Sequence, residues 1–193
     1  MAKKKKQEIV EQKPEIKEEK VVKFSVNLVG ERLIADDKNG SHNLYDQSRY
    51  GEIKDNKLQY SFVEGLYLLE KERIDILDGK KKMDFDDFVK FASKKEPNFW
   101  TRYVAYRDMR NRGYIVKTAL KFGADFRVYD RGIKPGEDHA KWIMYPVKET
   151  NTFSWYEFSA KNRVAHSTRK RLLIAIIDEE NDVTYYTIEW TRP

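Results

Sequence analysis

The sequence predicts an α/β protein of the α+β kind, built from two small mixed α/β domains. Hydrophobic residues make up 40% of its 193 residues and aromatic residues 13%, which suffices for packed cores. Apolar residues recur at helical spacing in some stretches and alternate with polar residues in others. The pattern changes near Lys94 to Pro97. We therefore expect an N-terminal domain over residues 21–96 and a C-terminal domain with a central mixed sheet over residues 97–193.

The start of the chain has the composition of a tail followed by a strand pair. Residues 1–20 hold seven Lys and five Glu with few apolar side chains, which predicts a disordered tail. Apolar and polar residues then alternate from Val22 to Leu28, and a second short apolar run follows at residues 32–35. Because Gly30 lies between the two runs, they predict a β-hairpin.

Three helices are expected in the middle of the chain. Residues 61–73 carry apolar side chains at helical spacing and predict an amphipathic helix. Asp84 is a suitable N-cap for a second helix. A third is expected over residues 97–112, with Pro97 in its first turn and Gly113 as its stop.

Alternation returns after Gly113 and predicts a mostly antiparallel or mixed sheet. A helix over about residues 155–170 interrupts the sheet, with Phe158, Val164 and Ala165 as its expected buried positions. The expected strands cover residues 114–118, 126–129, 142–147, 172–177 and 183–190.

Composition excludes several classes of protein. The absence of Cys rules out disulfides, thiolate zinc sites, iron–sulfur clusters and a cysteine nucleophile. There is no run of about 18 apolar residues and no apolar stretch behind the N-terminal lysines, so we expect no membrane span and no secretory signal. No glycine-rich phosphate loop is present. These absences predict a soluble, cytoplasmic protein without a cofactor or metal.

The positive charge is concentrated in one half of the chain. The formal net charge is +6, and residues 97–193 hold 17 basic and 12 acidic side chains, a net charge of +5. A local basic excess favours nucleic acid as the partner, with a solvated basic face as the alternative.

Few residues could carry out acid–base chemistry. Of the three histidines, His139 follows a polar, turn-rich loop over residues 130–138, whereas we expect His42 in an ordinary loop and His166 packed within a helix. Tyr129 ends the strand before that loop, and alternation places it on the opposite strand face from the apolar residues. Lys170 belongs to a basic junction over residues 163–171, which a solvated helix end would also explain.

Three separated motifs, and the order in which they occur, are similar to those of a known family. They are residues 113–129, residues 139–141 and residues 163–170, with 10 positions from Tyr129 to His139 and 31 from His139 to Lys170. Together with residues 44–69, they make the chain resemble the archaeal tRNA-splicing endonucleases, also called tRNA-intron lyases. The resemblance runs from about residue 21 to the end, and it implies that the C-terminal domain is nuclease-like.

The resemblance implies a catalytic triad of Tyr129, His139 and Lys170. Members of the family cleave the bulge-helix-bulge motif of precursor tRNA without a metal, leaving a 2′,3′-cyclic phosphate and a 5′-hydroxyl. Tyr129 would accept the proton of the attacking 2′-OH, and His139 would protonate the leaving 5′-oxygen. Lys170 would stabilise charge on the phosphorane and lower the pKa of Tyr129.

Further implications concern RNA contacts and assembly. Arg163 and Trp190 would sandwich a flipped bulge base, with Arg192 competing with Trp190 for the second position. An acidic turn resembles the loop with which one subunit docks on another, and a homotetramer is the implied assembly, with residues 183–190 as an edge strand that pairs between subunits. The residues of the acidic turn are Asp178, Glu179, Glu180 and Asp182.

Two alternatives remain open at this point. One is a noncatalytic RNA-binding or structural subunit of such an assembly, which an intact Tyr129, His139 and Lys170 set disfavours. The other is a metal-dependent nuclease that uses Asp125 or Asp130, which only a divalent ion would activate.

Overall fold

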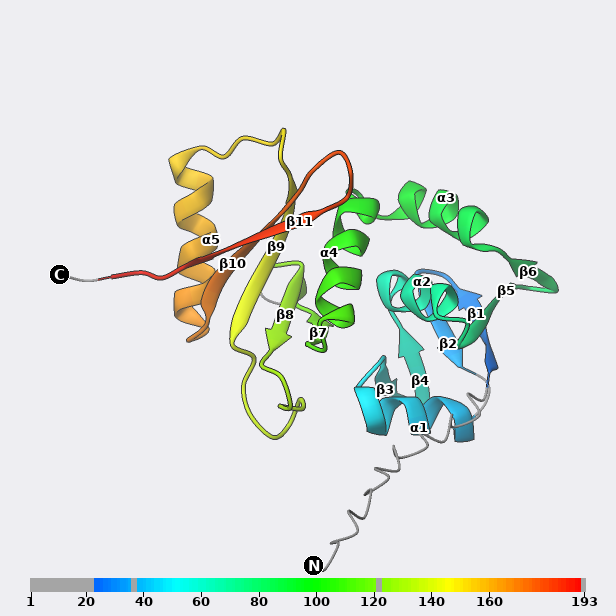
Figure 1. Ribbon diagram of the computed structural model, residues 1–193. Helices are drawn as coiled ribbons and strands as arrows, with labels where there is room; N and C mark the ends of the chain where they lie inside the picture. The colour runs from blue at the N-terminus through cyan, green and yellow to red at the C-terminus, as the bar shows by residue number, and fades with distance from the viewer. Residues whose placement is uncertain (1–22, 36–37, 121–122, 192–193) are drawn as a thin grey trace, which may run out of the picture.

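Two β-sheets flank a central helix, α4 (Phe99–Asn111), as Figure 1 shows. This computed structural model describes residues 23–35, 38–120 and 123–191. The predicted tail over residues 1–20 and the candidate Arg192 lie outside the described residues. Within them, no helix combines the length and the apolar character needed to cross a bilayer.

The N-terminal sheet has the strand order β3-β4-β2-β1-β5-β6, in which only the β1–β5 pair is parallel. The predicted hairpin is confirmed: β1 and β2 are antiparallel, and Gly30 turns the chain at φ 60°. The elements of this region are β1 (Phe24–Val29), β2 (Arg32–Ala35), α1 (Lys38–Ser48), β3 (Glu52–Lys54), β4 (Lys57–Tyr60), α2 (Phe62–Glu70), β5 (Ile74–Asp78), β6 (Lys81–Met83) and α3 (Phe85–Lys95).

The helices of this region correct two predictions. Helix α2 is not amphipathic, because every residue from Phe62 to Leu68 is buried between the sheet and the helices α3 and α4. Gly65 permits this close packing, since a Cβ at that position would lie 2.0 Å from a methyl carbon of Leu33. His42 lies in α1 rather than in a loop. The N-cap of α3 is confirmed, because the Asp84 carboxylate accepts the backbone N–H of Asp87.

The C-terminal sheet is mixed, as predicted, with the strand order β11-β10-β9-β8-β7. Strands β9 and β10 are parallel and the other neighbours are antiparallel. Strand β11 is an edge, so its outer side is available for pairing, whereas β10 is an interior strand. The elements are β7 (Ile115–Thr118), β8 (Phe126–Tyr129), β9 (Trp142–Lys148), α5 (Trp155–Ser167), β10 (Arg171–Ile177) and β11 (Val183–Ile188).

Helix α5 is shorter than predicted because its last turn is capped at Thr168. It starts with a capping box in which Ser154 and Glu157 satisfy each other's backbone N–H groups. Of its expected buried positions, Ala165 is fully buried, whereas Phe158 and Val164 are only partly buried. The helix therefore covers the sheet with a narrow apolar face.

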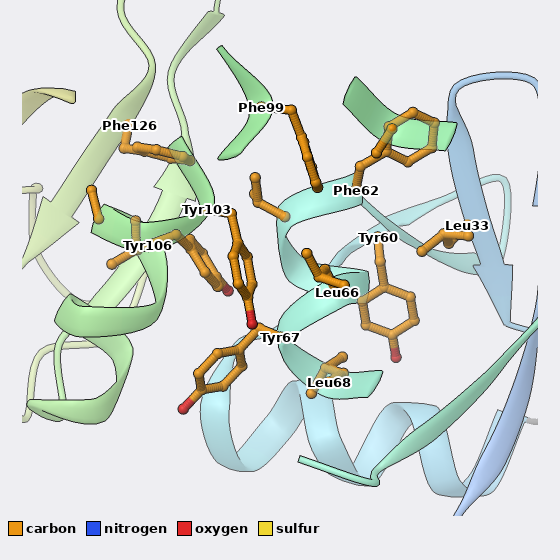
Figure 2. Close-up of a cluster of buried hydrophobic side chains, with 14 of the residues drawn as sticks. Leu33, Tyr60, Phe62, Leu66, Tyr67, Leu68, Phe99, Tyr103, Tyr106 and Phe126 are labelled. Carbon is orange, nitrogen blue, oxygen red and sulfur yellow. The ribbon is translucent and has the colours of Figure 1, made fainter. Parts of the chain in front are cut away.

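The two faces of the C-terminal sheet contact different partners. One face packs on α4 and joins a core that continues into the N-terminal region, where Tyr106 lies 5.8 Å from both Phe126 and Tyr67 between ring centroids. Figure 2 shows the α4 side chains between β8 and α2. The other face and α5 enclose a smaller core. Because α4 contacts both regions, the division at residues 96–97 stays a prediction.

A buried ion pair also joins the two regions. The ammonium of Lys117, on β7, lies 3.1 Å from a carboxylate oxygen of Glu64 and donates to the carbonyls of Arg49 and Gly51. Burial alone would raise the pKa of Glu64, but the charge of Lys117 and hydrogen bonds from Ser61 and Gly51 lower it below its usual range. All donors of this lysine thus have acceptors.

Candidate active site

Three separate segments bring Tyr129, His139 and Lys170 to one pocket of about 370 Å³. Tyr129 is the last residue of β8, His139 lies in the loop between β8 and β9, and Lys170 immediately precedes β10. The full lining consists of Arg127, Tyr129, Gly136, Glu137, Asp138, His139, Ala140 and Lys170. The pocket thus combines a phenol, an imidazole and two cations.

Strand alternation determines which side chains β8 contributes to the pocket. Phe126 and Val128 are fully buried on the α4 side of the sheet, so Arg127 and Tyr129 lie on the other face, as predicted. The expectation that Tyr129 points away from the main core holds, yet this side chain is only 5% exposed. Its neighbours in the pocket therefore cover it.

The loop that carries His139 is closed at its base. The Asp130 carboxylate lies 2.5 Å from the Lys141 ammonium, and the Lys141 N–H donates to the carbonyl of Val128. Gly136 adopts φ 98° within the loop, a conformation that favours glycine. His139 is exposed, as its position in the loop predicted, and can reach a bound substrate.

The junction between α5 and β10 fixes Lys170. Arg169 adopts φ 54°, a left-handed conformation that costs a non-glycine residue about 1–2 kcal/mol, and so turns the chain sharply after the helix. The Lys170 N–H then donates to the carbonyl of Ala165, and its ammonium donates to the carbonyl of Thr168 at 2.8 Å. These bonds hold the side chain at the pocket.

Burial and charge shift the two titratable groups in opposite directions. Burial raises the pKa of the Tyr129 phenol, and the Arg127 guanidinium opposes that rise. Burial lowers the pKa of Lys170, and the charge of Arg127 lowers it further. Arg127 is therefore a cation that favours ionisation of Tyr129. Sequence reasoning placed Arg127 on the strand face of Tyr129 but gave it no role.

A second pocket, of about 420 Å³, adjoins the first because Lys170 lines both. Its aromatic side is formed by His166 and Trp190, whose ring centroids lie 4.6 Å apart. His166 is exposed on α5, so the prediction that it is packed within the helix is wrong. Arg163 is exposed on α5 and does not line this pocket. The basic and polar lining residues are Lys141, Asn162, His166, Arg169, Lys170, Arg171 and Glu189.

The acidic turn lies at the far end of β10. The carboxylate of Asp178 accepts the backbone N–H groups of Glu180 and Asp182, which fixes the turn. The indole N–H of Trp100 donates to the side-chain carbonyl of Asn181 at 2.7 Å and ties the turn to α4. Glu179 and Glu180 are exposed beside it.

The carboxylates of the metal-dependent alternative are engaged elsewhere. Asp125 lies 2.9 Å from the guanidinium of Arg102, and Asp130 pairs with Lys141. Neither lines the pocket of the triad. In the described part of the chain, the acidic turn is the only place where three carboxylates lie close enough together to bind one metal ion.

Comparisons with known proteins find similarity in both regions of the chain. The family model for the catalytic C-terminal domain of tRNA intron endonucleases matches residues 99–185, and the model for their N-terminal domain matches residues 25–89. A tRNA-splicing endonuclease of Thermococcus onnurineus is 41% identical over 86% of this chain and 95% of its own length. The chain belongs to the tRNA intron endonuclease family.

Other tRNA-splicing endonucleases show the same likeness. That of Methanothermobacter thermautotrophicus is 38% identical over 78% of this chain and 87% of its own length. The enzyme of Nanoarchaeum equitans is 42% identical over 68% of this chain and 88% of its own length. Membership of the tRNA intron endonuclease family confirms the predicted family, the two-domain α+β fold and the enzyme class, an RNA endonuclease.

Proposed function

We propose that the pocket of Tyr129, His139 and Lys170 is the catalytic centre with which this enzyme removes introns from precursor tRNA. The substrate feature is the bulge-helix-bulge motif at the intron boundaries, and the reaction needs no metal. One observation carries the proposal: Tyr129, His139 and Lys170 come from three segments that span 41 positions of the sequence, yet they line one pocket. There they provide an acid–base pair and a cation. Family membership supports the substrate class.

The chemistry is an internal transfer at one phosphate. The Tyr129 phenolate accepts the proton of the 2′-OH, and the O2′ attacks the adjacent phosphorus. As the bond from phosphorus to O5′ breaks, the His139 imidazolium gives a proton to O5′, so the products end in a 2′,3′-cyclic phosphate and a 5′-hydroxyl. Lys170 stabilises the negative charge that develops on the phosphorane oxygens.

The electrostatics of the pocket set a direction for the pH dependence. Because burial raises the pKa of Tyr129, only a small fraction of the enzyme holds the phenolate near neutral pH. The phenolate fraction, which the proposed reaction requires, therefore rises with pH over the neutral range. Because burial and Arg127 lower the pKa of Lys170, its charge is lost at a lower pH than that of an ordinary lysine, and the rate falls on the alkaline side.

The adjoining pocket is proposed to receive the splayed bases and phosphates next to the cut. Single-stranded bases stack on aromatic rings, and the Trp190 ring is about half exposed beside His166. Arg163, one turn before His166 on α5, is proposed to cover the other face of the base. The basic side chains of this pocket supply the phosphate contacts.

A homotetramer is the proposed assembly. The outer edge of β11 can pair with the same strand of a second subunit, which satisfies its unpaired backbone groups. The acidic turn, with Glu179 and Glu180 exposed, is proposed to dock on a basic surface of another subunit. Its hydrogen bond to Trp100 presents the turn in one orientation.

The test uses an end-labelled bulge-helix-bulge RNA with the purified full-length chain in excess EDTA. Two cuts with a cyclic phosphate at each new 3′ end are expected. His139→Ala should abolish them, whereas His42→Ala, on α1 and outside the pocket, is the matched control that should leave them unchanged. Binding without cleavage would indicate the noncatalytic subunit, and cleavage that returns only with Mg²⁺ would overturn the proposed chemistry.

A further inference from the structure

Arg127 shares the pocket with the three proposed catalytic residues. It lies two residues before Tyr129 on the same face of β8, and its guanidinium carbon is 6.0 Å from the centroid of the Tyr129 ring. Strand β8 has hydrogen-bonded neighbours on both sides, β7 and β9. The backbone that carries Arg127 is therefore held as firmly as that of Tyr129.

The surroundings of Arg127 do not explain it as a structural residue. Lys117 lies directly opposite on β7, and like charges facing each other across an antiparallel pair are destabilising. The Nε of Arg127 is shielded from solvent and has no hydrogen-bond partner among the described residues. No carboxylate within the described ranges forms an ion pair with it. An unpaired, partly buried cation lowers stability, so a ligand is expected to complete its contacts.

The chemistry of the side chain specifies the ligand. A guanidinium presents a planar fork of donors that matches the oxygens of a phosphate. We propose that Arg127 is a further functional residue of this pocket, which binds the phosphate at the cleavage site through its guanidinium beside Lys170. The inference rests on the proposed function, because that function supplies the phosphodiester.

The same charge acts on both titratable neighbours. Arg127 opposes the rise of the Tyr129 pKa and adds to the lowering of the Lys170 pKa. Removing its charge raises both pKa values, so the alkaline limb of the pH–rate profile moves to higher pH. The other charged groups that face Arg127 are Lys117 on β7, Lys170 at the junction, and Glu137, Asp138 and His139 in the loop.

The experiment compares Arg127→Met and Arg127→Lys with Arg32→Met in the full-length chain. Arg32 is an exposed strand arginine outside the pocket and provides the matched control. Single-turnover cleavage of the bulge-helix-bulge RNA with saturating enzyme is measured from pH 6 to pH 10, together with thermal unfolding. Wild-type enzyme and His139→Ala are measured alongside to test the proposed function itself.

The expected result separates catalysis from stability. Arg127→Met loses about 10²-fold in rate, as removal of one preorganised donor does in other enzymes, while its melting temperature stays the same or rises. The alkaline limb of its pH–rate profile moves to higher pH. Arg127→Lys keeps the positive charge but loses the planar fork of donors. Its pH–rate profile should therefore match that of wild type, and its cleavage rate should fall by only about tenfold.

Three outcomes would overturn the role of Arg127. They are a rate for Arg127→Met equal to that of Arg32→Met, an unmoved pH profile, or a loss of folding in Arg127→Met, which would assign the residue to the fold. If wild-type enzyme cleaves and His139→Ala does not, the proposed function stands even when Arg127 fails. If wild-type enzyme does not cleave, the proposed function fails first.

Discussion

Lys117 and Arg127 lie opposite each other on neighbouring strands, yet their surroundings differ completely. Lys117 is 5% exposed and its ammonium contacts two carbonyl oxygens and the carboxylate of Glu64. Arg127 borders a pocket, and its Nε has no partner within the described residues. A buried cation whose donors are all satisfied serves the fold, whereas one that lacks partners beside a pocket is suited to a ligand.

The largest expected effect is on catalysis and comes from substitutions in the pocket that contains Arg127. His139→Ala and Lys170→Ala should each reduce the single-turnover cleavage rate by about 10²- to 10⁴-fold, because each removes a group that acts on the transition state. The RNA dissociation constant should change little in His139→Ala, and the melting temperature should change little in both variants. Cleavage at the wild-type rate in both variants would contradict the assignment of the pocket.

The next largest effect is on stability and comes from substitution of the buried Lys117. Lys117→Met leaves the Glu64 carboxylate buried without its cation, so the free energy of unfolding should fall by about 3–5 kcal/mol. The folded fraction should still cleave, because Lys117 does not line the pocket. Urea unfolding measures the loss. A change below about 1 kcal/mol would show that the pair contributes as little as a surface ion pair.

The pH dependence of unfolding tests the same pair from the side of Glu64. Its pKa is lowered in the folded state, so its contribution is complete above the pKa of the unfolded state and is lost as pH falls through the folded value. Each unit of lowering corresponds to about 1.4 kcal/mol. Stability should therefore decline below about pH 4.5, the usual range of a glutamate. In Lys117→Met the folded-state pKa of Glu64 rises, so this decline should become smaller or reverse, and identical profiles would contradict the coupling.

The smallest effect is expected for an exposed pair. Lys141→Met removes the ion pair with Asp130, but both side chains are about 40% exposed, so water replaces the lost contact. The free energy of unfolding should change by less than about 1 kcal/mol. A loss as large as that of Lys117→Met would mean that burial does not distinguish the two lysines.

Part of the fold could be predicted from local signals. Asp84 as a cap and Gly113 as a stop are determined by neighbouring backbone groups, and the structure confirms both. The predicted start of the third helix is wrong, because α4 begins at Phe99 after the N-cap Asn98 and Pro97 lies before its first turn. Two hairpins were missed although their turn residues signal them: Asp55 and Asn56 both adopt positive φ, and Gly79 follows an aspartate. Helix α1 has a poor helical composition, and packing of Leu44 and Tyr45 against the core stabilises it instead.

The candidate site divides in the same way. Tyr129, His139 and Lys170 could be named from a family resemblance, and alternation placed Arg127 beside Tyr129. The Glu64–Lys117 pair could not be foreseen, because its members are 53 residues apart. Lysines are also mostly exposed in proteins, so the sequence alone predicts that Lys117 lies on the surface. The burial that raises the pKa of Tyr129 likewise depends on three segments meeting in space.

The most direct test of the account replaces the leaving oxygen. A bulge-helix-bulge RNA with a 5′-phosphorothiolate at the cleavage site has a sulfur leaving group, which departs without protonation. If His139 is the general acid, His139→Ala should cleave this RNA at nearly the wild-type rate, while Tyr129→Phe should remain slow. Equal impairment of His139→Ala on the oxygen and sulfur substrates would contradict the central claim.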